Sequence, residues 1–219
     1  MTAARVLVMA KAPVPGQAKT RLGATVGMAA AADLAAAALL DTLDACAATF
    51  EVRYLALAGD LTRACRSDEI VEALAGWIVL DQVGASFADR LAHAHGRVAD
   101  CGPGPIVQVG MDTPQLTGPL LRAVADGLER ADVVLGPAED GGWWALGLAD
   151  GRDARALVDV PMSDPQTYRR TVEAFAGHRV LEVAELRDID TLDDAGTVAA
   201  AAPGTRFARA WTSRLAGAR

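Results

Sequence analysis

The chain has 219 residues, a length typical of a single α/β domain, and 52% of them are apolar, which is enough for a sizeable core. Its formal net charge of −7 argues against a nucleic-acid partner. The three cysteines form no C-x-x-C motif, so we expect free thiols. No apolar run is long enough to cross a bilayer, so we expect no membrane partner. The N-terminus has no signal-peptide pattern, and we expect a cytoplasmic location.

Segments typical of strands and helices alternate along the chain. Continuous apolar runs that alternate with helices indicate a mainly parallel sheet covered on both faces, and we expect one domain spanning 1–219. In the late helix at 164–177, Asp164 is expected as the cap and Pro165 as the first helical residue. The expected order is strand 5–10, helix 28–46, strand 52–58, helix 62–75, strand 77–80, helix 86–99, strand 105–110, helix 117–130, strands 132–138 and 143–149, helix 164–177, strand 179–184, helix 191–202, and an amphipathic C-terminal helix with Phe207, Trp211 and Leu215 on one face.

Four polar loops follow expected strands. One is basic, KAPVPGQAKTRL (11–22), and three are acidic: MDTP (111–114), EDGG (139–142) and DIDT (188–191). The carboxyl ends of parallel strands meet at one edge of a sheet, so these loops should converge on one crevice.

This combination of charges suits a nucleotide and a metal ion. Lys11, Lys19 and Arg21 can neutralise phosphates, and Gly16 lets backbone N–H groups approach them closely. Carboxylates beside phosphates imply a divalent cation between them. Mg²⁺ is usually held by one or two carboxylates together with phosphate oxygens and water, a role that fits Asp112 and either Asp188 or Asp190.

Each loop also has a purely structural interpretation. The basic loop lacks the G-x-x-x-x-G-K-[ST] pattern and could be a solvated turn, Asp112 could cap a turn or helix, EDGG could be a hairpin turn, and DIDT could start a helix. The combination of the four loops, rather than any one of them, favours a site. His93 and His95 are too close in sequence to act as paired ligands, so we expect them to be at the surface or partly buried.

Four segments resemble, in the same order, those of the nucleotide-diphospho-sugar transferase (glycosyltransferase-A-like) fold: VLVMAKAPVPGQAKTRL, GMDTP, LGPAEDGGWWALGL and DIDTLDD. They are most similar to the bacterial transferases associated with radical-SAM and selenium domains, and the resemblance extends from Arg5 to about Ala199. A more distant resemblance is to the 2-phospho-L-lactate guanylyltransferases. The resemblance implies a three-layer α/β/α fold with a nucleotide site.

The resemblance also implies roles for single residues. Metal binding by Mg²⁺ or Mn²⁺ falls to Asp112 with Asp190, and Asp188 is the rival for the second ligand. QVGASFADRL (82–91) resembles a nucleotide-pocket segment of the transferases. The chain departs from the guanylyltransferases at EDGGWW, which leaves the acceptor open. The expected nucleotide-binding residues are Lys11, Pro15, Gly16, Lys19, Arg21, Gln82 and Arg90, and the expected substrate-binding residues are Asp140, Gly141, Gly142, Trp143 and Ser163.

The leading functional hypothesis is a Mg²⁺-dependent transferase that moves a nucleotidyl group from a nucleoside triphosphate to a small phosphorylated or acidic acceptor. Three cations in the first loop suit a triphosphate better than a sugar diphosphate. Glycosyl transfer from a nucleotide sugar is the alternative, and a non-catalytic nucleotide-binding module is a third hypothesis. The sequence identifies neither the nucleotide base nor the acceptor, and it leaves open whether the protein forms a homodimer. The expected catalytic residues are Lys19, Arg21, Asp112 and Asp140.

Overall fold

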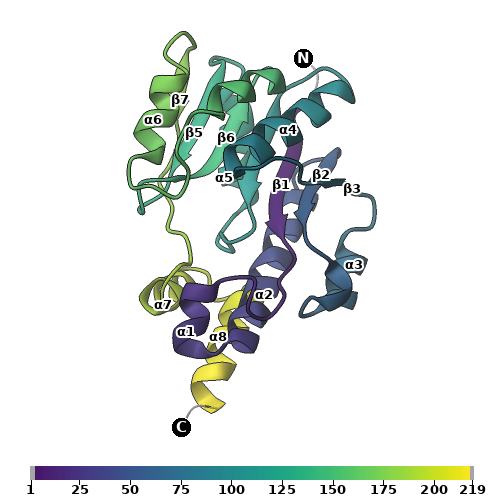
Figure 1. The fold of residues 1–219 in the computed structure, drawn as a ribbon, viewed down its shortest axis with the longest axis vertical. Coiled ribbons are helices and arrows are strands. Elements are labelled where there is room, and N and C mark those ends of the chain that lie inside the picture. Colours follow the sequence, from purple (N-terminus) through teal and green to yellow (C-terminus); the bar gives the residue numbers. More distant parts are fainter. Residues whose placement is uncertain (1–2, 218–219) are drawn as a thin grey trace.

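A seven-stranded sheet forms the centre of the computed structural model, which describes residues 3–217 (Figure 1). The strand order is β3-β2-β1-β4-β6-β5-β7, and only β6 runs antiparallel to its neighbours. The mainly parallel sheet expected from the sequence is therefore confirmed. The strands are β1 (Arg5–Lys11), β2 (Arg53–Ala58), β3 (Ile78–Asp81), β4 (Ile106–Gly110), β5 (Val133–Pro137), β6 (Trp143–Leu148) and β7 (Val180–Glu182).

Helices cover both faces of this sheet, which gives the three expected layers. Alternate residues of β1 point to opposite faces, as the period of a strand requires. Val6 and Val8 pack with α2 (Met28–Ala47), α3 (Ser67–Ala73) and α5 (Gly118–Gly127). Leu7 and Met9 pack with α4 (Phe87–Asp100), α6 (Thr167–Ala174) and the 3-10 segment Gly151–Leu157.

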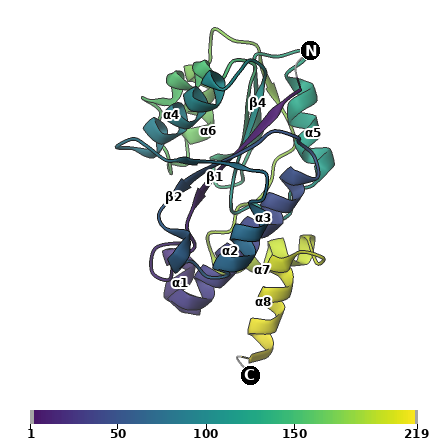
Figure 2. The same ribbon diagram turned by 90° about the vertical axis from the view of Figure 1, so that its right-hand side faces the viewer.

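A third apolar cluster lies beyond the carboxyl edge of the sheet, where α1 (Thr20–Val26), α7 (Leu192–Ala201) and α8 (Arg206–Gly217) pack on one end of α2 (Figures 1 and 2). Asp41 of α2 holds the start of α8, because its carboxylate accepts hydrogen bonds from the backbone N–H groups of Arg206 and Phe207 at 2.9 and 2.8 Å. The long helix α2 thus belongs to both the sheet core and this cluster. Division of the chain into a single domain stays a prediction.

Several local expectations were wrong. Residues 20–26 form α1 rather than a loop, and the helix expected at 62–75 is split into a 3-10 turn, Leu61–Arg63, and α3. The helix α6 begins at Thr167 after the cap residue Gln166, so Pro165 lies outside it, and Asp164 instead accepts the backbone N–H of Gln166. His95 is fully buried rather than at the surface or partly buried.

The remaining expected elements are present within one to three residues of their predicted bounds. Phe207 and Trp211 are buried as the amphipathic pattern predicts, whereas Leu215 is half exposed. No helix among residues 3–217 is both long and apolar enough to span a membrane.

Candidate functional site

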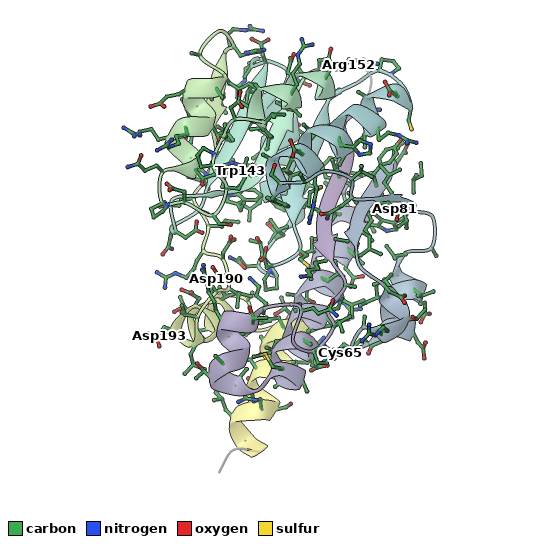
Figure 3. The ribbon with its side chains drawn as sticks, in the orientation of Figure 1. Cys65, Asp81, Trp143, Arg152, Asp190 and Asp193 are labelled. Atoms are coloured by element: carbon green, nitrogen blue, oxygen red, sulfur yellow. The ribbon has the colours of Figure 1, made fainter. Side chains whose placement is uncertain are left out.

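Two adjoining cavities open at the carboxyl edge of the sheet. The sheet cavity, of about 390 Å³, lies against β1, β4, α4 and the segment before α6. The loop cavity, of about 660 Å³, lies against residues 17–21. In Figure 3, Asp190 lies between the sheet and the lower helices, and Trp143 lies above it on β6. The two cavities share Lys11, Met111, Asp112, Asp140, Ser163, Asp164 and Asp190.

Lys19 connects loops that are far apart in sequence. It precedes α1 with a left-handed backbone, φ +47°, and its side chain is only 14% exposed. Its Nζ lies 2.7 Å from Asp112 Oδ2 and 3.2 Å from Asp190 Oδ1, and a guanidinium nitrogen of Arg21 lies 3.3 Å from Asp190 Oδ2. Burial alone would lower the pKa of Lys19, but attraction to Asp112, Asp190 and Asp188 outweighs burial and raises it. Lys19 is therefore a permanent cation.

Asp188 behaves differently from its neighbours. Burial and the nearby charge of Asp112 raise its pKa to about 8, with further contributions from Asp140 and Asp190, while Lys19 acts in the opposite direction. Thr113 donates a hydrogen bond of 3.4 Å to its Oδ1. The side chain is therefore mostly protonated at neutral pH, whereas Asp190 is engaged by Lys19.

The charged residues that line the two cavities separate by position in the chain. The cations come from residues 11–90 and the carboxylates from residues 112–190. Strand order explains this separation, because β3, β2 and β1 occupy one side of the sheet and β4, β6, β5 and β7 the other. In space the two sets meet, because Lys19 contacts Asp112 and Asp190 and Arg21 contacts Asp190, whereas Lys11 and Arg90 form no ion pair among residues 3–217. The cations are Lys11, Lys19, Arg21 and Arg90; the carboxylates are Asp112, Asp140, Asp164, Asp188 and Asp190.

The carboxylates fit a divalent cation that arrives with a polyphosphate. Among residues 3–217, no three Asp, Glu, His or Cys side chains form a ready-made metal site. Mg²⁺ needs only one or two carboxylates when phosphate oxygens and water complete its shell. Asp112 and Asp190 already share a cation, the ammonium of Lys19, and both offer the hard oxygen donors that Mg²⁺ or Mn²⁺ prefers.

The turn between β5 and β6 places part of the acidic side. Asp140 Oδ1 accepts the backbone N–H of Gly142 at 2.8 Å. Gly141 has φ +87°, and a Cβ there would lie 2.1 Å from the carbonyl oxygen of Pro165, so the turn packs tightly on that segment. EDGG is thus the hairpin turn that the structural interpretation allowed, and it also brings Asp140 to both cavities. Trp143 lines the sheet cavity while Trp144 is buried in the core.

Most residues expected at the site line one of the cavities, and three do not. Pro15 and Gly16 lie in an exposed turn of the basic loop, with φ +77° at Gly16. Gly141 lies in the hairpin turn and packs closely against Pro165. Those that line a cavity are Lys11, Lys19, Arg21, Gln82, Arg90, Asp112, Asp140, Gly142, Trp143, Ser163, Asp188 and Asp190.

Side chains at the edge of β3 and at α4 are held by backbone carbonyl groups. Gln82 donates both amide hydrogens, to Ala10 O and Ala56 O at 2.8 Å each, so only its carbonyl oxygen remains available to a ligand. Arg90 donates from Nε to Gly84 O at 3.2 Å. Both side chains are therefore fixed in place beside the sheet cavity.

Sequence reasoning missed several lining residues. Gln108 interrupts the apolar strand IVQVG, and this single polar residue was a signal that could have been used. Asp164 was interpreted only as a helix cap. Met9, Met162 and Gln17 carried no recognisable signal, because such residues are common in cores and loops.

Solved structures share this fold. A protein from Desulfovibrio desulfuricans G20, provisionally described as a nucleotide-diphospho-sugar transferase, is 27% identical, with a TM-score of 0.83 over 99% of this chain and 95% of that one. Rv0371c from Mycobacterium tuberculosis H37Rv, in complex with manganese, is 21% identical, with a TM-score of 0.51 over 90% and 98% of the two chains. A CMP:2-keto-3-deoxy-manno-octonic acid synthetase in complex with CTP is 12% identical, with a TM-score of 0.56 over 90% and 97%. The last two likenesses show the fold alone.

The likeness to the Desulfovibrio protein confirms the expected nucleotide-diphospho-sugar transferase fold and its glycosyltransferase-A-like superfamily. No curated protein sequence matches the chain. A family model described as "Uncharacterized protein conserved in bacteria (DUF2064)" matches residues 42–164. That range is more than half of the chain, so the chain belongs to the DUF2064 family.

Proposed function

We propose that this chain is a metal-dependent transferase that uses a nucleotide donor. The observation that carries the proposal is the gathering of four cations and five carboxylates around one crevice, where Lys19 bridges Asp112 and Asp190. A nucleotide's phosphates would lie in the loop cavity, beside Lys11, Lys19 and Arg21. The fold supports this assignment, because the Desulfovibrio protein is described as a nucleotide-diphospho-sugar transferase and the octonic acid synthetase was solved with CTP.

The charge balance of the crevice explains why a metal is needed. Lys19 is already engaged by Asp112 and Asp190, so it does not offer its whole charge to a phosphate. The carboxylates nearly cancel the four cations, and a triphosphate would still face repulsion from them. A divalent cation bound by Asp112 and Asp190 would neutralise phosphate oxygens and the leaving group. Asp188 becomes available as a further ligand only after it loses its proton. The manganese complex of Rv0371c is a further hint in the same direction.

Nucleotidyl transfer is the reaction we favour. The acceptor's hydroxyl oxygen would form a bond to the α-phosphorus, and the bond from the α-phosphorus to the pyrophosphate oxygen would break. Lys19 and Arg21, beside the loop cavity, would stabilise the charge on the departing pyrophosphate. The hydroxyl proton would pass to Asp140, whose Oδ2 receives no hydrogen bond from residues 3–217.

Glycosyl transfer is the second candidate, favoured by the likeness to the Desulfovibrio protein. In that reaction the acceptor oxygen would bond to the anomeric carbon of a nucleotide sugar, and a nucleoside diphosphate would leave. Asp112 would still hold the metal against the diphosphate. The link to radical-SAM proteins and the relation to guanylyltransferases remain predictions.

Product identity separates the two reactions. The purified protein would be incubated with Mg²⁺, each nucleoside triphosphate or nucleotide sugar and a mixture of small hydroxyl compounds. Release of pyrophosphate supports nucleotidyl transfer, and release of a nucleoside diphosphate from a nucleotide sugar supports glycosyl transfer. Asp112→Asn should abolish turnover, whereas Asp126→Asn, an exposed position on α5 with the same charge change, should not. Nucleotide binding without turnover in the wild type would instead indicate a non-catalytic module.

A further inference from the structure

The sheet cavity contains a buried amide that lacks a partner. Gln108 of β4 lines this cavity, the residue is 2% exposed, and no hydrogen bond from residues 3–217 reaches its buried Oε1. Met9 and Met162, which also line the cavity, are apolar. Leaving a buried acceptor unpaired costs about 1–3 kcal/mol. A hydrogen-bond donor on a bound ligand would remove this cost, so the amide is a candidate ligand contact.

The wall beside Gln108 presents acceptors and an apolar ring surface. Trp143 donates its indole N–H to Thr171 Oγ1 at 3.2 Å, so only its carbon surface is left for a ligand. Asp140 and Asp164 each use Oδ1 to accept a backbone N–H at 2.8 Å. Their Oδ2 atoms receive no hydrogen bond from the described part of the chain, so each can still accept one from a ligand.

We propose that the acceptor is a neutral polyhydroxy compound of the sugar class, which stacks on Trp143 and donates hydroxyl hydrogen bonds to Gln108, Asp140 and Asp164. This inference extends the proposed function and rests on it, because the bound compound is an acceptor only if the protein is a transferase. Sugars carry both features that the wall requires, namely many hydroxyl donors and an apolar C–H face.

Charged acceptors fit the same wall poorly. A phosphate or carboxylate group on this wall would lie against Asp140 and Asp164, although Lys11 and Arg90 also line the cavity. An ammonium group would be attracted by Asp140 and Asp164 but repelled by Lys11 and Arg90, which line the same cavity, so a group of either charge meets like charges there. The proposal therefore differs from the phosphorylated or acidic acceptor that the sequence favoured.

The test follows the indole N–H signal of Trp143 by NMR, assigned through Trp143→Phe among the four tryptophans. Neutral probes are D-glucose, D-mannose, D-galactose and myo-inositol, and charged probes are D-glucose 6-phosphate, D-glucuronate and D-glucosamine. We expect at least one neutral probe to shift the signal, with and without nucleotide. Tighter binding of a charged probe than of its neutral parent, or no shift with any neutral probe, would overturn the proposal.

Two variants connect the binding to the named residues. Gln108→Leu should weaken the neutral probe about tenfold, because one hydrogen bond is lost. It should leave unfolding stability unchanged or higher, because the unpaired amide is removed. Asp164→Asn should weaken binding too, while Asp159→Asn, an exposed position five residues earlier, should not. Unchanged affinity in both Gln108→Leu and Asp164→Asn would refute the assignment.

Calorimetric titration of nucleotides, run on the same samples, keeps the two proposals apart. If a neutral probe binds and no nucleotide does, the proposed function fails while the sugar-class ligand stands. If nucleotides bind and every neutral probe fails, only the acceptor assignment is lost.

Discussion

Replacement of Lys19 by methionine tests the electrostatic centre of the site. The variant keeps most of the side-chain volume but leaves Asp112 and Asp190 facing each other without their shared cation. Breaking a fully buried ion pair costs about 3–5 kcal/mol, and exposed pairs are worth less than about 1 kcal/mol. Lys19 is 14% exposed and its two partners are 31% and 43% exposed, so this case is intermediate. We expect a loss of about 2 kcal/mol at neutral pH.

Urea unfolding measures this loss, and added Mg²⁺ should restore part of it because the divalent cation replaces the ammonium between the carboxylates. The matched control is Arg21→Met, which removes a cation that is 78% exposed and should have no measurable effect. In a double-mutant cycle with Asp112→Asn, the losses should not add. Additive losses, or a Lys19→Met variant as stable as the wild type, would refute the electrostatic reasoning.

Three further predictions concern stability. Burial lowers the pKa of His95 to about 3, against an ordinary value of 6.5. Below pH 6.5 only the unfolded chain gains this proton, so between pH 6.5 and pH 5 the wild type should lose about 2 kcal/mol of unfolding free energy relative to His95→Leu, as urea titrations of both proteins at both pH values will show. The comparison with His95→Leu is needed because the raised pKa of Asp188 acts in the opposite direction in both proteins. Gly141→Ala should lower the melting temperature and broaden the Trp143 indole signal, because the new Cβ clashes with Pro165 O; an unchanged melting temperature would contradict this. Asp41→Ala should cost about 1–2 kcal/mol in urea unfolding, since two partly buried N–H groups at the start of α8 lose their acceptor; a wild-type midpoint would contradict it.

The sheet was predictable because its strands are continuous apolar runs, and β1 and β4 carry this signal clearly. The start of α1 was not predictable. It follows Lys19, whose left-handed backbone is stabilised by contacts with Asp112 and Asp190, and these contacts span 93 and 171 residues. A pattern within a short window contains no information about such long-range pairs.

The convergence of the four loops was predictable because the carboxyl ends of parallel strands meet at one edge of a sheet, and the structure brings Lys19, Asp112 and Asp190 into contact. The burial of His95 was not, because a histidine on the inner face of a helix has the same sequence pattern as one at its border. Gln108 is the single polar residue of an apolar strand, a signal that shows a departure from the core pattern but not what the side chain contacts. Its importance depends on the missing hydrogen-bond partner, which only the structure reveals.

Calorimetric titration with nucleotides tests the central claim most directly. GTP, CTP, UTP, ATP, UDP-glucose and GDP-mannose would each be titrated into the protein with and without Mg²⁺. We predict Mg²⁺-dependent binding of at least one of them, which is weakened by Arg21→Ala and by Asp112→Asn. Absence of binding by all six, or binding that is unaffected by Mg²⁺ and by both variants, would contradict the proposal that this crevice holds a nucleotide through its cations and a metal.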